Sequence, residues 1–249
     1  LPLVRALGTN VVIEDLLVGR EISVFAVCDG ERALALPIAK DYKRIGENDT
    51  GLNTGGMGSY SPAELPAGIT PAEIVETVHK PVLRELNRRG TPFSGLLYAG
   101  LMITPAGPRV LEYNVRFGDP ECQPLLMRLQ SDLVDLIEAT LDGQLDQVEP
   151  PQWDPQASVC VVMASEGYPG SYQKGNVIEG IDEADAMDKV KVFHAGTTLQ
   201  EGQVVNHGGR VLGVTALGET VAAAQERAYK AIEKIHWQGA WYRSDIADK

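Results

Sequence analysis

An acid, an amide and a guanidinium follow one another in the segment Val110–Glu121, V-L-E-Y-N-V-R-F-G-D-P-E. Side chains alternate between faces along a strand, so Glu112 and Asn114 share one face if this segment is extended. Carboxylate and amide oxygens suit Mg²⁺ (or Mn²⁺), a hard cation that also bridges to nucleotide phosphates. Arg116 follows and can stabilise a phosphoryl or acyl oxyanion. The segment therefore predicts the metal and phosphate end of an ATP-using site.

The same residues also fit an ordinary strand followed by the start of a helix. Glu112 and Asn114 are then the solvated face of an edge strand. Asp119 and Pro120 are then an N-cap and the first helical residue. The segment alone leaves both interpretations open, so the rest of the chain has to decide between them.

Composition indicates a soluble globular protein. The 249 residues suffice for one large or two modest domains. No apolar run approaches the roughly 20 residues of a membrane span, and no signal-peptide pattern is present. The net charge of −12 argues against a nucleic-acid surface. The three cysteines form no CxxC pair, which is typical of buried thiols in the cytoplasm. Because the chain begins with Leu1, we expect either processing or a longer parent protein.

The pattern of apolar residues predicts an α+β chain in two parts, residues 1–149 and 150–249, divided at a Pro-rich polar linker over residues 146–157. Strands are expected at residues 10–13, 22–27, 33–36, 96–104, 109–114, 158–163, 191–194 and 209–217. Helices are expected from residue 70 and at residues 120–141, 183–187 and 221–235. Residues 40–62 are glycine-rich and are expected to form a long functional or disordered loop.

Two of the expected helices carry explicit end signals. Thr70-Pro71-Ala72-Glu73 is a capping box with Pro at the first helical position. The apolar residues that follow, Ile74, Val78, Val82 and Leu86, form one stripe at i+4 spacing. Pro81 should kink this helix. Gly143 is expected to cap the C-terminus of the helix over residues 120–141.

Near the N-terminus, the segment V-I-E-D-L-L-V-G-R-E offers a short hinge and a second acid. The backbone of residues Glu14, Asp15, Leu16 and Leu17 could bind the edge of a purine, and the carboxylate of Glu21 could accept ribose hydroxyls. An ordinary hairpin with solvated acids explains the same residues and is favoured for this segment taken alone.

A cationic loop precedes the glycine-rich stretch. Lys40-Asp41-Tyr42-Lys43-Arg44 is either a solvated charge run or an anion site. The glycines of Asn53-Thr54-Gly55-Gly56 permit close backbone approach, so that amide groups can converge on an anion. The stretch is neither a Walker loop nor a dinucleotide fingerprint.

The order of these features along the chain resembles that of the ATP-grasp superfamily. The amino-acid sequences of the segments resemble those of the glycinamide ribonucleotide synthetase family. The segments that carry the resemblance are V-V-I-E-D-L-L-V-G-R-E-I-S, K-D-Y-K-R, N-T-G-G-M-G-S-Y-S-P, L-Y-A-G-L-M-I, V-L-E-Y-N-V-R-F-G-D-P-E-C-Q, S-D-L, V-M-A-S-E-G-Y-P-G, V-F-H-A-G-T, G-G-R-V-L-G-V-T-A-L-G and Y-R-S-D-I. They extend over nearly the whole chain, and N-T-G-G-M-G and R-F-G-D-P-E are highly specific.

The chain also departs from the family pattern. Lys40 and Tyr42 stand where the family usually has Gln and His, and Leu52 stands where it usually has Pro. The upstream α/β domain of the family and its lid, a subdomain whose lysines cover the triphosphate, are not in this sequence. The resemblance therefore implies part of an ATP-grasp core followed by a small C-terminal α/β domain.

The resemblance implies ATP-dependent joining of glycine to 5-phosphoribosylamine through glycyl phosphate, by a monomeric enzyme without nucleic-acid or membrane partners. It implies a metal pair, Glu112 and Asn114, and a catalytic Arg116 that holds the glycine carboxylate. It further implies that ATP meets Glu14, Asp15, Leu16, Leu17 and Glu21, and that substrates meet Asp41, Lys43, Arg44, Asn53, Thr54, Gly55, Gly56, Asp119 and Arg210, with Lys40 adding charge on the same side of the cleft.

Two alternatives stay open. One is another ATP-grasp ligase, of the purine-pathway carboxylase type, which would need a bicarbonate site. The other is a non-catalytic fragment that binds partners or nucleotide weakly. Because the lid lysines are missing, we expect residues 1–249 alone to make no glycinamide ribonucleotide.

Overall fold

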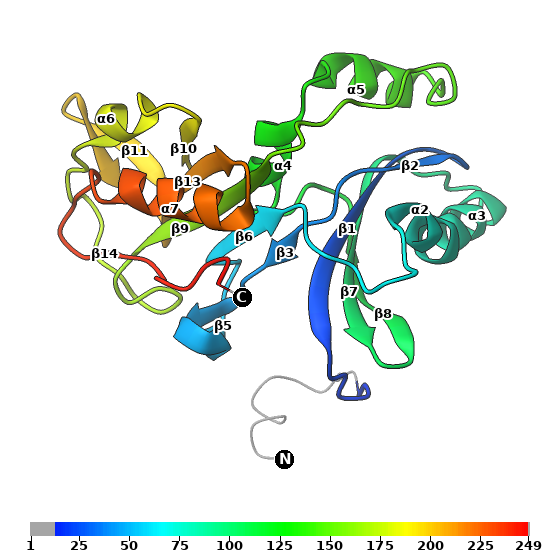
Figure 1. Ribbon diagram of the computed structural model, residues 1–249, viewed down its shortest axis with the longest axis horizontal. Coiled ribbons are helices and arrows are strands. Elements are labelled where there is room, and N and C mark those ends of the chain that lie inside the picture. Colours follow the sequence, from blue (N-terminus) through cyan, green and yellow to red (C-terminus); the bar gives the residue numbers. More distant parts are fainter. Residues whose placement is uncertain (1–12, 249) are drawn as a thin grey trace.

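Two antiparallel sheets organise the chain, and the computed structural model describes residues 13–248 of it (Figure 1). The strands are β1 (Arg20–Asp29), β2 (Ala33–Ala35), β3 (Lys40–Asp41), β4 (Arg44–Gly46), β5 (Thr50–Asn53), β6 (Gly58–Ser61), β7 (Ser94–Thr104), β8 (Gly107–Asn114), β9 (Ala157–Ser165), β10 (Val190–His194), β11 (Thr197–Gln200), β12 (Gln203–Asn206), β13 (Arg210–Gly218) and β14 (Ala240–Trp241). The helices are α2 (Pro71–Ile74), α3 (Lys80–Arg88), α4 (Cys122–Arg128), α5 (Leu133–Leu141), α6 (Ile181–Asp185) and α7 (Val221–Ile232), with a 3₁₀ turn at Glu47–Asp49 and a π turn at Val75–His79.

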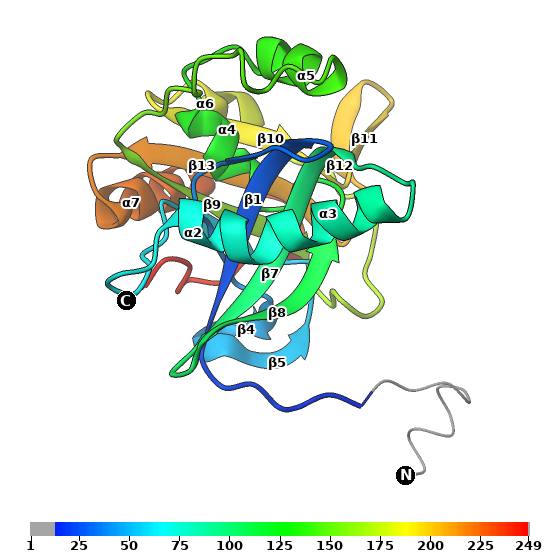
Figure 2. The ribbon, with the colours of Figure 1, turned by 90° about the vertical axis from the view of Figure 1, so that its right-hand side faces the viewer.

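The first sheet has the strand order β2-β1-β7-β8 and is covered on one face by helices α2 and α3 (Figure 2). Its apolar residues Val24, Ala99 and Leu101 pack there against Ile74 and Val78 of the helical segment. By alternation, the other face carries Ser23, Glu112 and Asn114 beside the buried rings of Phe25 and Tyr98, and we call it the polar face.

The helical segment after Thr70 begins as expected but changes its buried face. The Thr70 hydroxyl accepts a hydrogen bond from the Glu73 amide (3.2 Å), which completes the capping box. The chain then widens into the π turn just before Pro81, whose missing amide removes a helical donor. A π turn inserts one extra residue, so the buried stripe continues at Leu83 instead of the expected Val82.

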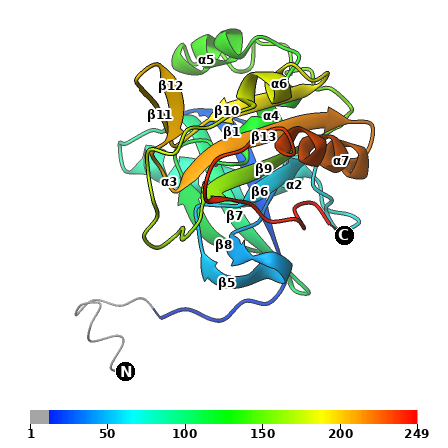
Figure 3. The ribbon, with the colours of Figure 1, turned by 90° about the vertical axis from the view of Figure 1, so that its left-hand side faces the viewer.

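The second sheet has the order β10-β13-β9-β6-β3, with β14 beside β9, and contains a large part of the core. Every residue of β9 is buried, because α7 packs on one face and α4 contacts the other (Figure 3). The buried face of α7 consists of Ala224, Ala228, Ala231 and Ile232, and its three alanines let the helix lie close to β9 and β13. Together the two sheets and their helices confirm the α+β class.

The chain between the two sheets is more ordered than the sequence suggested. Residues 40–62 were expected to be a functional or disordered loop but contain β3, β4, β5 and β6. Within the segment β3 pairs with β6 and β4 pairs with β5, and β6 also pairs with the remote strand β9. Ser23 of β1 pairs with Ala39 through two backbone hydrogen bonds (2.8 and 3.1 Å), and the next two residues form β3 of the second sheet. Since β6 pairs with β9, one sheet unites strands from both sides of residue 150; the division at 149/150 stays a proposal.

The single helix expected over residues 120–141 is wrong. The chain is extended at Leu129, and α5 starts afresh with the Asp132 carboxylate accepting from the Val134 amide (2.8 Å). The buried Arg128 explains the break, since its guanidinium donates to the carbonyl of Gln156 (2.8 Å) and to the Ser61 hydroxyl (2.8 Å). The Pro-rich linker is thereby fixed to α4 and β6. Gly143, at φ +67°, follows α5 in the left-handed conformation expected of it.

Of the strand expected at residues 10–13, residues 10–12 lie outside the described part, and Ile13 is not in a strand. Within residues 13–248, no helix has the length and apolar character needed to cross a membrane.

Candidate active site

The polar face of the first sheet gathers the acid and amide side chains. Backbone pairing places Ser23 of β1 opposite Gly100 of β7, and Gly100 opposite Glu112 of β8. Asn114 lies opposite Tyr98 in the same way. Because directly paired residues point to the same side of a sheet, these side chains share one surface. β3 passes close to this surface, since it follows directly on the pairing of Ala39 with Ser23 (Figure 1).

Glu112 and Asn114, the expected metal pair, lie on one face of β8. A Cβ atom at Gly100 would lie 3.2 Å from the Glu112 Cγ atom, so glycine leaves room for that carboxylate. Among the described residues, no group of three His, Cys, Asp or Glu side chains could hold a metal ion. Two oxygen ligands fit Mg²⁺, which keeps several waters and binds phosphate oxygens. The metal role itself stays a prediction.

Lys43 connects the two acids expected to serve ribose and metal. Its ammonium forms an ion pair with Glu21 and lies 3.6 Å from the Glu112 carboxylate. Burial acts to lower the pKa of Lys43, but the hydrogen bond and charge of Glu21 outweigh it and raise that pKa above its usual value. Lys43 therefore stays charged between Glu21 and Glu112, where a triphosphate can replace one of its partners.

The expected purine hinge has no regular secondary structure. Residues Glu14, Asp15 and Leu16 are exposed, Leu17 is half-buried, and none of them forms a strand. The hinge ends at Gly19, whose backbone lies close to β7. A Cβ atom at this position would lie 2.1 Å from the Ile103 carbonyl oxygen, so only glycine fits there. The exposed apolar side chains Leu16 and Val18 leave apolar surface available to a base.

The backbone amides of the glycine-rich loop are hydrogen-bonded within the protein. The Thr54 amide donates to the Lys43 carbonyl (2.7 Å), and the Gly56 amide donates to the Thr54 hydroxyl (3.0 Å). The Gly55 amide donates to the hydroxyl of Tyr168 (3.0 Å). These amides are used within the protein, so the expected convergence of amides on an anion is wrong for Thr54, Gly55 and Gly56. Asn53, exposed at the end of β5, keeps its side chain available.

Arg210 joins this loop to the turn after β8. Its Nη1 donates to the carbonyls of Gly55 (2.7 Å) and Asp119 (2.6 Å), and it lies 3.3 Å from the Asp119 carboxylate. The Tyr168 ring packs across Gly209, and its hydroxyl accepts the hydrogen bond from the Gly55 amide. We call Tyr168 and Arg210 the loop latch. The latch gives Arg210 a positioning role that sequence spacing did not reveal, while its expected contact with substrate phosphate stays a prediction.

Removing the Tyr168 hydroxyl tests the loop latch directly. Tyr168→Phe keeps the ring on Gly209 but leaves the Gly55 amide without its acceptor, which we expect to cost about 1 kcal/mol locally. Hydrogen exchange at Gly55 should accelerate by about fivefold, measured by NMR at unchanged global stability. Tyr172→Phe is the matched control, because the Tyr172 hydroxyl makes no hydrogen bond among the described residues. Equal exchange in both variants would contradict the latch.

Arg116 and Asp119 lie in the turn between β8 and α4. Arg116 is exposed, and its only hydrogen bond among the described residues goes to the neighbouring Phe117 carbonyl (2.9 Å), so its charge is available to a ligand. Asp119 does not cap a helix, contrary to expectation. The Asp119–Pro120 peptide is cis and α4 begins only at Cys122. The Asp119 carboxylate is instead engaged by Arg210.

Of two further cations expected in the cleft, Lys40 faces away from the polar face and Arg44 has no contact with it among the described residues. Along β3 and the residues after it, Asp41 and Lys43 share one face and Lys40 and Tyr42 the other. Lys40 lies over the Tyr42 ring (4.5 Å), so its placement with Lys43 is wrong. Arg44 is exposed on β4 and donates to the Gly51 carbonyl (2.7 Å). Among the described residues, no hydrogen bond or ion pair joins Arg44 to the polar face, so its substrate role stays a prediction.

Sequence reasoning missed a buried group below the polar face. Ser23 donates to a carboxylate oxygen of Glu121 (2.8 Å) and lies 3.1 Å from the Tyr98 hydroxyl. Glu121 is only 3% exposed. Its position after R-F-G-D-P in the motif was visible in the sequence, but nothing in the spacing indicated that its carboxylate would turn inward beside Asp41.

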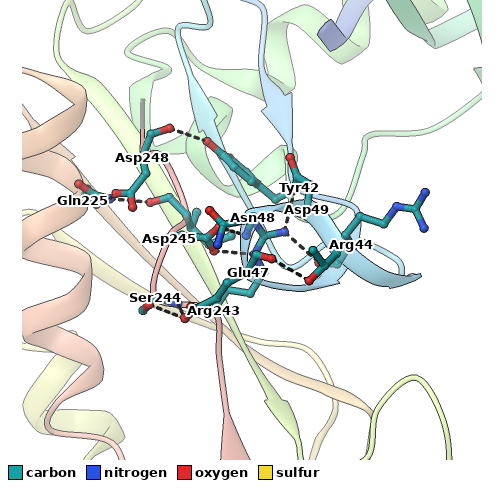
Figure 4. Close-up of polar contacts among 12 residues, drawn as sticks. Tyr42, Arg44, Glu47, Asn48, Asp49, Gln225, Arg243, Ser244, Asp245 and Asp248 are labelled. Carbon is teal, nitrogen blue, oxygen red and sulfur yellow. Dashed lines mark hydrogen bonds and ion pairs between the residues drawn. The ribbon is translucent and has the colours of Figure 1, made fainter. Parts of the chain in front are cut away.

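A second missed group is the buried Arg243, which ties the C-terminal tail to the β4–β5 hairpin (Figure 4). Its guanidinium binds both carboxylate oxygens of Asp245 (2.7 Å each), the Asp49 carboxylate (2.9 Å) and the Arg44 carbonyl (2.9 Å). The Asn48 amide donates to Asp245 as well (2.8 Å). We call this set of residues the tail clamp. It supports the hairpin that leads into the glycine-rich loop.

Comparison with known proteins agrees with this geometry. Family models match twice: the phosphoribosylglycinamide synthetase ATP-grasp (A) domain over residues 4–122, and the C domain of the same synthetase over residues 158–249. A phosphoribosylamine–glycine ligase of Rhodopirellula baltica is 56% identical over 98% of this chain, and one of Pseudomonas aeruginosa is 52% identical over 96%. The chain spans 56% of the length of each of these relatives.

Solved structures give the same result. The phosphoribosylamine–glycine ligase of Thermotoga maritima matches with a TM-score of 0.84 and 36% identity over 94% of this chain and 57% of its own. A biotin carboxylase domain of Hydrogenobacter thermophilus shares only the fold, at a TM-score of 0.61 and 14% identity. The sheets and the acid–amide pair thus define an ATP-grasp ligase domain. Within that class, the chain belongs to the phosphoribosylglycinamide synthetase family, of which it contains the ATP-grasp A-domain and C-domain parts.

Proposed function

We propose that the protein carrying this chain joins glycine to 5-phosphoribosylamine with ATP, giving glycinamide ribonucleotide, ADP and phosphate. The observation that carries the proposal is the pair Glu112 and Asn114 facing Lys43 across the polar face, in a chain of this family. Phosphoryl transfer depends on positioning and on offsetting charge, and this surface offers both. We further propose a monomeric, cytoplasmic enzyme without nucleic-acid partners.

Each residue of the site has a proposed role that follows from its position. Glu112 and Asn114 would hold a Mg²⁺ (or Mn²⁺) ion, which offsets triphosphate charge when bound. Lys43 would contact the phosphates, and the exposed Arg116 would hold the glycine carboxylate during attack on the γ-phosphorus. The resulting glycyl phosphate would lie near Asn53 and the latched loop. The amine nitrogen of phosphoribosylamine then attacks the acyl carbon, and phosphate leaves.

Nucleotide binding is tested by a pair of variants at the hinge. We propose that Glu21 accepts the ribose hydroxyls and that the backbone of residues 15–17 binds adenine. A hydrogen bond to a charged group contributes roughly 1.5–3 kcal/mol, so Glu21→Ala should weaken ATP binding about ten- to a hundredfold in calorimetry. Asp15→Ala should have little effect, because its side chain is exposed and its backbone is kept. Equal large losses would show that side chains read the base.

The overall reaction is tested with the complete gene product, including any sequence encoded upstream of Leu1. ADP formation should require both glycine and ATP, and mass spectrometry should detect glycinamide ribonucleotide when phosphoribosylamine is added. Bicarbonate-dependent ADP formation without glycine would favour a carboxylase instead. A complete gene product that binds nucleotide but turns over no ATP, with or without glycine, would favour the non-catalytic alternative. Residues 1–249 alone should form no product.

A further inference from the structure

Two carboxylates that take no part in the chemical steps described above meet below the polar face; one of them, Asp41, was expected only to contact substrate. Asp41 comes from β3, and Glu121 comes from the turn that precedes α4. Each carboxylate occupies space that only a glycine leaves open. A Cβ atom at Gly56 would lie 2.6 Å from the Asp41 Oδ1 atom, and one at Gly118 would lie 2.3 Å from the Glu121 Oε2 atom. The backbone is therefore shaped around both carboxylates.

The two carboxylates differ in how they are satisfied. Glu121 accepts a hydrogen bond from Ser23 and is fixed beside the Tyr98 hydroxyl. The Oδ1 atom of Asp41 is buried and has no hydrogen-bond partner among the described residues. A buried acceptor without a hydrogen bond lowers stability. Such an atom is therefore expected to bind a proton, a cation or a ligand.

The positive charge near Asp41 and Glu121 does not balance the negative charge of these carboxylates. The ionisable groups that face Asp41 are Glu121, Lys43, Glu21 and, through its hydroxyl, Tyr98. Lys43 is already paired with Glu21 and lies near Glu112. One lysine thus faces several carboxylates. The buried Oε1 atom of Glu21 is ion-paired with Lys43, whereas the Oδ1 atom of Asp41 has neither a hydrogen bond nor an ion pair among the described residues.

We propose that Asp41 accepts the proton that the substrate amine loses, and that Glu121, fixed by Ser23 and Tyr98, positions Asp41 electrostatically for that task. The inference rests on the proposed function and deepens it. In the second step a C–N bond forms between the amine nitrogen and the acyl carbon. The C–O bond to phosphate breaks, and phosphate leaves with the electron pair. One N–H proton passes to the Asp41 carboxylate, which returns it to solvent after product release.

The protonation behaviour of the pair is consistent with this role. Burial first, and then the negative charge of Glu121, raise the pKa of Asp41 well above its usual range. Burial likewise raises the pKa of Glu121, against the opposing hydrogen bond from Ser23. A general base works best when its pKa lies near the working pH, and such bases typically contribute about 10²- to 10⁴-fold in rate.

The first test separates the two chemical steps in the complete gene product. Asp41→Asn should slow formation of glycinamide ribonucleotide by about 10²-fold or more. Glycyl phosphate formation should persist, measured without phosphoribosylamine as glycine-dependent positional isotope exchange in ¹⁸O-labelled ATP. A raised KM for glycine at unchanged kcat would overturn the inference and assign Asp41 to the glycine ammonium. A wild-type protein that shows no exchange and no ligation would instead refute the proposed function.

The second test asks whether Glu121 acts through charge. Glu121→Gln keeps an acceptor for Ser23 but removes the charge next to Asp41, so the pKa of Asp41 should fall. The acid limb of the kcat–pH profile should then shift to lower pH by roughly one unit. A merely structural role would lower kcat equally at every pH, and that result would overturn the role of Glu121.

The third test needs no activity. A carboxylate whose pKa is raised by folding loses stability as pH rises from its unfolded pKa of about 3.9 towards its folded pKa. Asp41→Asn removes this loss, so its urea midpoint relative to wild type should increase as pH rises above about 4. Asp188→Asn, the same change at an exposed position, should show no such trend. A pH-independent difference for Asp41→Asn would overturn the buried-pair argument.

Discussion

Replacing Glu112 with glutamine is expected to reduce kcat of the complete gene product by about 10²- to 10³-fold and to raise the Mg²⁺ concentration needed for half-maximal activity. The change keeps the size of the side chain but removes the one negative charge of the proposed metal pair. Of the two carboxylates near Lys43, Glu21 and Glu112, only Glu21 then keeps its negative charge. ATP binding without metal should change little, because the hinge is untouched.

The measurement is a titration of activity with Mg²⁺, together with calorimetry of ATP in its absence. Tyr113→Phe is the matched control on the same strand. Tyr113 points to the opposite face, and its hydroxyl donates to the Val78 carbonyl (3.0 Å), so its loss should cost about 1 kcal/mol of stability at unchanged metal dependence. Wild-type activity with unaltered Mg²⁺ dependence in Glu112→Gln would remove the metal assignment.

Breaking the tail clamp should have the largest effect on stability. Arg243→Met keeps the apolar bulk of the side chain, which is 1% exposed, but removes the guanidinium donors to Asp245 and Asp49. Breaking a buried pair typically costs about 3–5 kcal/mol. We expect about 3 kcal/mol here, because Asp245 keeps the Asn48 amide and Asp49 is largely exposed. Urea unfolding measures the loss, and hydrogen exchange over residues 44–53 should locate it.

The pH dependence of this loss gives an internal check. Burial alone would raise the pKa of Asp245, but its bonds to Arg243 and the Asn48 amide outweigh burial and lower it. A lowered pKa contributes stability above the unfolded carboxyl pKa of about 3.9, and that contribution is lost as pH falls through the folded pKa. The difference in free energy of unfolding between wild type and Arg243→Met should therefore become smaller as the pH falls below about 4.

Two controls define the clamp. Asp49→Ala removes the exposed partner and should cost no more than about 1 kcal/mol. A double-mutant cycle of Arg243→Met with Asp245→Asn should show a coupling of about 0.5–3 kcal/mol. A coupling near zero, or an unfolding curve for Arg243→Met that matches wild type at neutral pH, would show that the clamp does not stabilise the tail.

Sequence reasoning succeeded where a residue's role depends on its own stretch of backbone. The two-residue period of a strand placed Glu112 and Asn114 on one face before any partner strand was known. The same holds for the capping box at Thr70, where donor and acceptor are three residues apart. The residues that carry the family resemblance also predicted the α+β fold and the ATP-grasp class.

Sequence reasoning failed where a distant segment decides. The helix expected over residues 120–141 has a continuous helical pattern, yet the packing of Arg128 and Leu129 against the linker interrupts it. The glycine-rich segment has few apolar anchors, yet β9 supplies the partner that turns residues 58–61 into a strand. In both cases the competing interactions come from residues that local propensity does not include.

By itself, the sequence determined which chemical groups are present and which faces of their own strands they occupy. Only the tertiary structure decided their partners: Lys43 between Glu21 and Glu112, Arg210 on a carbonyl 91 residues away, and Arg243 on one 199 residues away. The physical reason is that periodicity specifies direction relative to the local backbone. The partner of a side chain depends on how remote elements pack, and burial then sets the charge state of groups such as Asp41.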